Sequence, residues 1–167
     1  MVLLNAPVAP PVSFYSLSAE LCDGKGIDLN LLKGKKVLLV NTASGCGFTE
    51  QFDQMQTLYR QYSEHLLVLA FPTNDFKEEK NDDEKIAMFC RENFRVSFPI
   101  MKKSGVIVKR SQNNVYKWLT DPEKNGWNKQ SPTWNFCKYL INEEGMLVGY
   151  FGSAIEPLGK EITGLLK

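Results

Sequence analysis

The sequence has almost no excess of charge of either sign and no long hydrophobic run. Its 167 residues include 20 basic (lysine and arginine) and 19 acidic ones, so the formal net charge is +1. Binding to nucleic acid or to an anionic membrane usually requires a basic surface, and this balance gives no sign of one. The longest apolar runs, VLLV and LLVLAF, are far shorter than the roughly 20 residues of a membrane-spanning helix. We therefore expect no nucleic-acid partner and no membrane span.

Close cysteine pairs are also absent. Cys22, Cys46, Cys90 and Cys137 are scattered along the chain, which excludes the CxxC pattern of zinc ribbons and of dithiol oxidoreductases. We expect no bound metal and no other cofactor.

The first residues, MVLLNAPVAPPVSF, lack the positively charged start and the apolar core of a secretion signal. The expected location is cytoplasmic, in a reducing compartment where such thiols stay free or cycle during catalysis.

The chain length and the 43% hydrophobic content suffice for one hydrophobic core. We predict a single domain over residues 13–167, which follows an extended, proline-containing lead-in over residues 1–12. The turn signal Asp23-Gly24-Lys25-Gly26 lies between short apolar pieces and predicts an N-terminal β-hairpin.

Two apolar segments have the composition of buried strands: KVLLVNTA from residue 36, and LLVLAF at residues 66–71. Between them, apolar residues recur at three- and four-residue steps from Thr49, which predicts a helix and hence a parallel βαβ unit. Further along, we predict a helix at residues 84–94, a strand at SFPIMK, a short helix at NNVYKWL, a hairpin over residues 133–151 and a terminal helix. This order predicts an α/β, thioredoxin-like fold with a central mixed sheet flanked by helices.

Cys46 stands between two glycines where the first strand is expected to run into the first helix. Open α/β folds bind ligands at this edge of the sheet. Free N–H groups and the partial positive charge at a helix start stabilise a thiolate, and glycines leave room for a small substrate. Because Thr49 occupies the place of a second CxxC cysteine, dithiol exchange is excluded, whereas a single thiolate suits attack on a peroxide. The alternative is that Cys46 is merely a small residue in a turn.

Four segments, taken together, resemble the glutathione peroxidase family in its cysteine-containing, non-selenium branch. They are VNTASGCGFT, LAFPTNDF, FCRENFRVSFPIMKK and WNFCKYLINEEGMLVGYF, and they lie in the family's order within residues 37–151. The resemblance implies an enzyme, a peroxidase that reduces hydrogen peroxide and organic hydroperoxides through a sulfenic acid on Cys46. It also implies that Trp134 and Asn135 donate hydrogen bonds around the sulfur.

The loop after LAFPTNDF departs from the family's pattern. Aligned without gaps, Glu79 occupies the position of the family's glutamine, and Asp75 replaces another glutamine. A carboxylate beside a thiol opposes ionisation of that thiol by like-charge repulsion. Glu79 is therefore a candidate fourth member of the site, and the alternative is a solvated acidic loop with no role in it.

The resemblance implies that Cys90 resolves the sulfenic acid and that thioredoxin then reduces the resulting disulfide. By periodicity alone, Cys90 fits equally well as a packing residue of its helix. Three alternatives remain: a peroxidase that uses glutathione as its reductant, a peroxide sensor that passes its oxidation to a partner protein, and a non-catalytic binding module. Cys22 and Cys137 match no functional position, and we expect a monomer.

Overall fold

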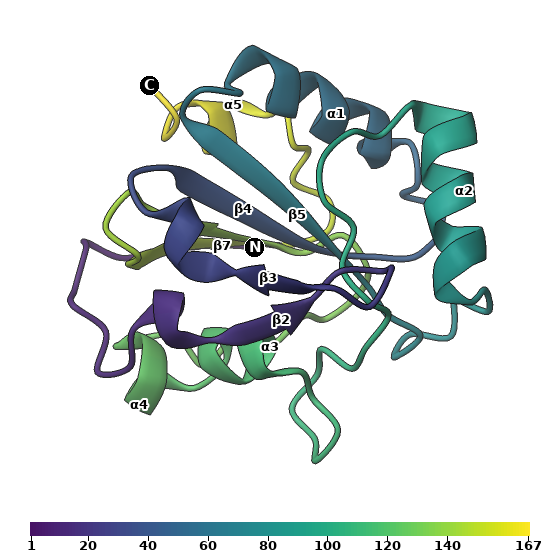
Figure 1. Ribbon diagram of the computed structural model, residues 1–167. Helices are drawn as coiled ribbons and strands as arrows, with labels where there is room; N and C mark the ends of the chain where they lie inside the picture. The colour runs from purple at the N-terminus through teal and green to yellow at the C-terminus, as the bar shows by residue number, and fades with distance from the viewer.

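The computed structural model describes residues 1–167, and a five-stranded sheet lies at its centre (Figure 1). The strand order is β1-β7-β6-β4-β5. Strand β4 pairs in parallel with β5 and antiparallel with β6, so the predicted mixed sheet is confirmed. The strands are β1 (Val2–Leu4), β4 (Lys36–Thr42), β5 (Leu66–Pro72), β6 (Lys138–Ile141) and β7 (Leu147–Phe151).

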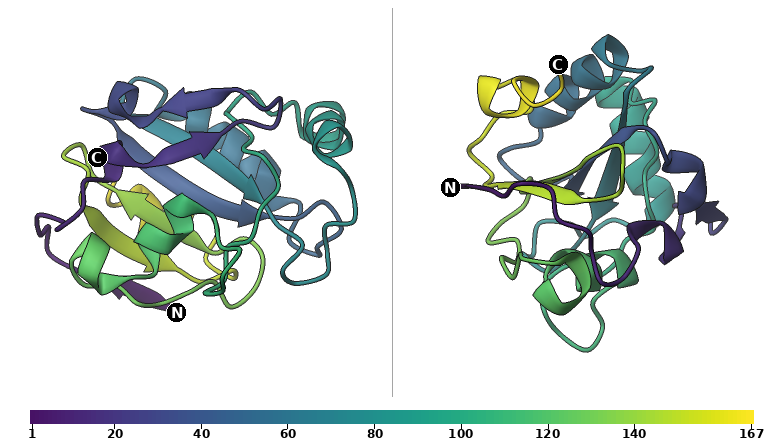
Figure 2. Two further views of the ribbon diagram at one scale, coloured as in Figure 1. Left: turned by 60° about the horizontal axis from the view of Figure 1, so that its bottom comes forward. Right: turned by 90° about the vertical axis from the view of Figure 1, so that its left-hand side faces the viewer.

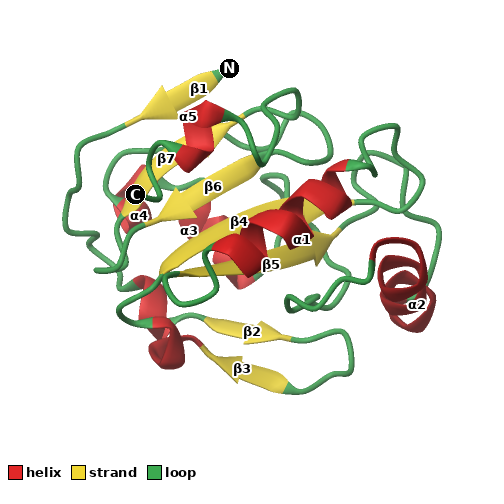
Figure 3. Ribbon diagram, turned by 90° about the horizontal axis from the view of Figure 1, so that it is seen from above, coloured by secondary structure: helices red, strands yellow, loops and turns green.

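Helices cover both faces of this sheet (Figure 2). One face carries α1 (Gln51–Gln61) and α5 (Lys160–Thr163), and the other carries α3 (Asn114–Leu119) and α4 (Pro122–Asn125). Helix α2 (Asp83–Phe94) stands beside the end of the sheet toward which β5 points (Figure 3). Two short 3₁₀ helices, Phe14–Ser16 and Leu29–Leu32, complete the helical elements.

The apolar run of β4 is continuous because both of its faces are buried. Val37 and Leu39 pack in the core on the α3 side, whereas Leu38 and Val40 pack in the core on the α1 side. All four side chains are fully buried. Since side chains alternate along a strand, one uninterrupted hydrophobic sequence serves both cores. The carboxyl end of β4 and the loop that follows it therefore start from the centre of the protein.

Most of the predicted elements form. The N-terminal hairpin consists of β2 (Ser18–Glu20) and β3 (Gly26–Asp28), which pair as a separate two-stranded sheet. The second hairpin joins β6 to β7 through a turn at residues 142–145, in which Gly145 has the positive φ of +79° that glycine adopts without strain. The terminal helix is real but short, and α1 begins at Gln51 rather than at Thr49.

Two predictions are wrong in part. The segment SFPIMK forms isolated bridges, from Ile100 to Ala70 and from Met101 to Leu21, instead of a strand, because Pro99 has no N–H to donate to a ladder. The division of residues 1–12 from the domain overlooked β1, which pairs antiparallel with β7 at the edge of the sheet. Three residues are too few to show a strand period in the sequence. The short helix α4 was also not predicted.

No helix of this fold combines the length and the apolar character that crossing a membrane would require.

Candidate active site

Cys46 lies four residues beyond the end of β4, in a turn that precedes α1. Its side chain is 5% exposed and belongs to the core on the α1 side, together with Phe52 and Phe136. The sulfur accepts a hydrogen bond from the Phe48 N–H at 3.4 Å, and the Cys46 carbonyl accepts one from the Thr49 N–H at 3.2 Å. A backbone donor therefore points at the sulfur before α1 itself begins.

The two glycines beside Cys46 have different roles. A Cβ on Gly45 would lie 2.7 Å from the Glu78 carbonyl oxygen, which already accepts the Gly45 N–H at 2.9 Å. Only glycine allows the two loops to approach this closely. A Cβ on Gly47 would meet no atom within 4 Å. The loop is therefore held tightly on the Gly45 side of the cysteine, whereas open space lies beside Gly47.

Glu79 is 1% exposed, so it does not lie on a solvated face. Its carboxylate accepts hydrogen bonds from the Ser44 N–H at 2.9 Å and from the Ser44 hydroxyl at 2.5 Å. The Glu79 N–H in turn donates to Asn74 Oδ1, and the Asn81 side-chain amide donates to the Ser44 hydroxyl. These bonds join the loop after β5 to the loop of Cys46, two residues before the cysteine.

The segment containing Trp134 and Asn135 is anchored on the carboxyl end of β4. The Asn41 side-chain amide donates to the Trp134 carbonyl at 2.9 Å, and the Phe136 N–H donates to the Asn41 carbonyl at 2.6 Å. Phe136 has a φ of +64°, in the left-handed region that residues with side chains rarely adopt. Such backbone conformations cost roughly 1–3 kcal/mol and concentrate at functional sites, where surrounding contacts enforce them.

The Asn135 carboxamide is fully buried, yet neither its oxygen nor its nitrogen has a hydrogen-bond partner. Leaving one buried polar group unpaired costs about 1–3 kcal/mol, so native structures keep few of them. Trp134 is 38% exposed, and its ring packs against the Phe76 ring at a centroid distance of 5.5 Å. Both residues thus lie at the edge of the sheet from which the Cys46 loop leaves, with the donor groups of Asn135 unused.

Cys90 lies on α2, is 1% exposed and shares the core on the α1 side with Cys46. Burial raises the pKa of the Cys90 thiol to about 12; the negative charge of Glu79 adds to this shift, and Arg91 opposes it. All four cysteines are free thiols. The structure therefore brings Cys46, Glu79 and Cys90 into one region, but it holds the Cys90 thiol in its neutral form.

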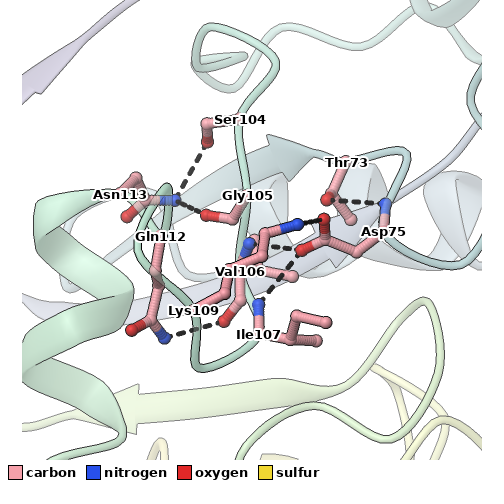
Figure 4. Close-up of polar contacts among 9 residues, drawn as sticks. All are labelled: Thr73, Asp75, Ser104, Gly105, Val106, Ile107, Lys109, Gln112 and Asn113. Atoms are coloured by element: carbon pink, nitrogen blue, oxygen red, sulfur yellow. Dashed lines mark hydrogen bonds and ion pairs between the residues drawn. The ribbon is translucent and has the colours of Figure 1, made fainter.

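Asp75, the second departure from the family's glutamines, organises a neighbouring loop (Figure 4). Its carboxylate accepts the Val106 N–H at 2.6 Å and the Ile107 N–H at 3.0 Å, and it pairs with the Lys109 ammonium. Burial alone would raise the pKa of Asp75, but these donors hold it below its usual value. The sequence pattern marked this position as unusual and did not reveal its partners, which lie more than 30 residues away.

The remaining two cysteines differ in their surroundings. Cys137 is fully buried and accepts a hydrogen bond from the Tyr150 hydroxyl at 3.2 Å, whereas Cys22 is partly exposed. No group of three or more histidine, cysteine, aspartate or glutamate side chains is arranged to hold a metal ion.

Comparison with known proteins gives close relatives over most of the chain. The family model described as glutathione peroxidase matches residues 14–120. Glutathione peroxidase-like peroxiredoxin 2 of Saccharomyces cerevisiae is 39% identical, covering 92% of this chain and 97% of the relative. Glutathione peroxidase-like peroxiredoxin GPX5 of Chlamydomonas reinhardtii is 40% identical, covering 92% and 96%.

Solved structures agree with this assignment. The crystal structure of T. cruzi GPX1 superimposes with a TM-score of 0.69 at 29% identity and covers 92% of this chain and 96% of that one. A thiol:disulfide interchange protein of the thioredoxin family from Chlorobium tepidum gives a TM-score of 0.67 at 14% identity, which shows the thioredoxin-like fold alone. On the family match, the relatives and the geometry around Cys46, this chain belongs to the glutathione peroxidase family.

Proposed function

We propose that this chain is a thiol peroxidase that reduces hydrogen peroxide and organic hydroperoxides through Cys46, in the cytoplasm and as a monomer. The observation that carries the proposal is the edge of the sheet at the end of β4. There Cys46, whose sulfur accepts a backbone hydrogen bond, follows β4, and the backbone on either side of Asn135 is hydrogen-bonded to the same strand. The Asn135 carboxamide itself is buried and has no hydrogen-bond partner. Membership of the glutathione peroxidase family and relatives named peroxiredoxins support the same chemistry.

In the oxidative half-reaction, the Cys46 thiolate attacks one peroxide oxygen and the O–O bond breaks. The sulfur becomes a sulfenic acid, and the leaving oxygen takes a proton to give water or an alcohol. The Asn135 amide and the Trp134 indole N–H are the proposed donors that orient the peroxide and stabilise the developing negative charge. Such donors accelerate a reaction only if they are held in place beforehand.

We propose that Glu79 occupies the position of the family's glutamine but has a different role. An ionised carboxylate only accepts hydrogen bonds, so it has nothing to donate to sulfur or peroxide. Through its two bonds to Ser44 it instead orders the loop that carries Cys46.

In the second half-reaction, Cys90 attacks the sulfenic sulfur, water leaves and a Cys46–Cys90 disulfide forms. Thioredoxin then reduces this disulfide. A thiol with a pKa of about 12 is almost entirely protonated near neutral pH, so Cys90 becomes a nucleophile only when α2 opens and water reaches it. Local opening of one helix is within the range of motions that folded proteins make.

The reductant and the nucleophile are tested together by steady-state turnover of hydrogen peroxide. We expect turnover with thioredoxin and thioredoxin reductase to be much faster than with glutathione and glutathione reductase. Cys46→Ser should abolish it in both assays while the circular dichroism spectrum stays unchanged. Faster turnover with glutathione would show that glutathione, not thioredoxin, is the reductant. Substantial activity in Cys46→Ser would refute the peroxidase mechanism.

Removing a donor beside the sulfur should slow the oxidation of Cys46 itself. We expect Asn135→Ala and Trp134→Phe each to lower the single-turnover rate constant with peroxide on the order of 10²-fold, the usual effect of losing a preorganised donor. The matched controls are Trp127→Phe and Asn128→Ala, whose side chains bond only to the fold and should affect stability instead. Unchanged rates in both site variants would make Trp134 and Asn135 purely structural.

Neutralising Glu79 without changing its shape isolates the effect of its charge. Glu79→Gln keeps an oxygen for the Ser44 N–H, and it removes a negative charge that opposes a thiolate on Cys46. Stopped-flow measurements should show that peroxide oxidises this variant several-fold faster than the wild type. The exposed Glu50→Gln serves as the control for a change in net charge. A slower rate in Glu79→Gln would mean that the carboxylate itself assists the reaction.

Peptide mapping after one equivalent of peroxide identifies the resolving thiol. We expect a Cys46–Cys90 disulfide, and hydrogen exchange of the amides of residues 84–94 should accelerate when it forms, because α2 must open. Cys90→Ser should instead accumulate a sulfenic acid on Cys46. A sulfenic acid or a glutathione adduct on Cys46 in the wild-type chain would exclude Cys90 as the resolving residue, and a disulfide with α2 fully protected would exclude the opening.

A further inference from the structure

Lys138, the first residue of β6, is a fully buried lysine without an acidic partner. The ion pairs of the protein involve Lys36, Lys102 and Lys109 only. Burial lowers the pKa of Lys138 to about 7, although charges on Cys137 and Glu156 act to raise it. Lysine is almost never fully buried unless it is paired, because removing its charge from water is costly. An amine kept at this place therefore calls for a reason other than packing.

The amine binds two backbone carbonyls that follow β7. Lys138 Nζ donates to the Ser153 carbonyl at 3.1 Å and to the Ile155 carbonyl. The Ser153 carbonyl also accepts the Gln51 side-chain amide, from the start of α1, at 2.8 Å. Two donors from different elements thus converge on one carbonyl and fix the position of Ser153.

Ser153 connects Lys138 to the segment that contains Asn135. Its hydroxyl donates to the Asn135 carbonyl at 2.6 Å and lies 3.5 Å from the Cys137 sulfur. The neighbouring residues of Asn135 are held from the other side by Asn41. The backbone of Asn135 is therefore held between β4 and Ser153, while its carboxamide remains unpartnered.

We propose that Lys138 is a positioning residue for the oxidation of Cys46: it fixes Ser153, whose hydroxyl fixes the backbone that aims the Asn135 carboxamide. This inference rests on the proposed role of Asn135. Lys138 touches neither the sulfur nor the peroxide. Its effect is geometric, and displacing a catalytic group by about 1 Å can cost on the order of 10²-fold in rate.

We expect the fold to tolerate the loss of this amine. Replacing a buried charged group with an apolar side chain of similar size is often neutral or stabilising. Lys138→Met keeps a side chain of similar length and removes the hydrogen bonds to the Ser153 and Ile155 carbonyls. The variant thus separates positioning of Asn135 from support of the fold.

The first test measures the two half-reactions separately. In Lys138→Met and in the milder Ser153→Ala, we expect peroxide to oxidise Cys46 at least about tenfold more slowly, while dithiothreitol reduces the oxidised protein at the wild-type rate. The matched control is Gln56→Met, which removes another buried polar side chain, bonded only to Ser97. Equal losses in both half-reactions, or the same slowing in Gln56→Met, would overturn the inference.

The second test is a double-mutant cycle with Asn135→Ala. If Lys138 acts through Asn135, the double variant Lys138→Met/Asn135→Ala will be no slower than Asn135→Ala alone. Multiplying effects would show that Lys138 acts independently and would overturn the inference. A normal rate in Asn135→Ala refutes the proposed role of Asn135 itself, whereas a slow Asn135→Ala with normal Lys138→Met and Ser153→Ala refutes only the inference drawn here.

Urea unfolding at two pH values verifies that Lys138 is buried as described. Its pKa is about 7 in the folded chain against an ordinary 10.5, so between these values the unfolded chain binds more protons. The contribution of Lys138 to stability therefore rises with pH in that range, and its penalty is fully present below pH 7. The stability of Lys138→Met relative to the wild type should be greatest near about pH 6 and should decrease toward about pH 9. A pH-independent difference would mean that the pKa of Lys138 is not lowered in the folded chain, which would contradict the burial of an unpaired amine on which the inference rests.

Discussion

The candidate site depends on the carboxyl end of β4, where Asn41 connects the strand to a distant segment. This side chain is fully buried, and through its amide and its backbone carbonyl Asn41 holds the segment of Trp134 and Phe136, more than 90 residues away. The same strand, continued by four residues, delivers Cys46. Two hydrogen bonds thus place the segment of the proposed donors at the end of the strand from which the Cys46 loop leaves, and that strand is buried on both faces.

A second contact, between Glu79 and Ser44, joins the site to α2. The carboxylate is bonded to the Cys46 loop, and its charge contributes to the raised pKa of the Cys90 thiol. While α2 is closed, the Cys90 thiol is neutral and buried. In the proposed cycle this arrangement separates the two half-reactions, because Cys90 reacts only after α2 has opened.

Local sequence signals carried much of the fold. The period of α1, the continuous apolar run of β4 and the turns of both hairpins are determined within a few residues, and these elements were predictable. The failures have a common cause. Residues Val2–Leu4 become a strand only because β7 lies beside them, and SFPIMK has strand composition but places Pro99 where a ladder needs a donor.

For the site, the sequence by itself determined the candidate residues: one cysteine between two glycines after a buried strand, with a tryptophan and asparagine pair in a segment that resembles the family's. Only the tertiary structure decided the surroundings. It turned Glu79 from a residue of an acidic loop into a buried partner of Ser44, and it linked Lys138 through Ser153 to Asn135. The physical reason is that burial and hydrogen-bond pairing depend on groups tens of residues apart, whose meeting is set by the packing of the sheet and not by local sequence.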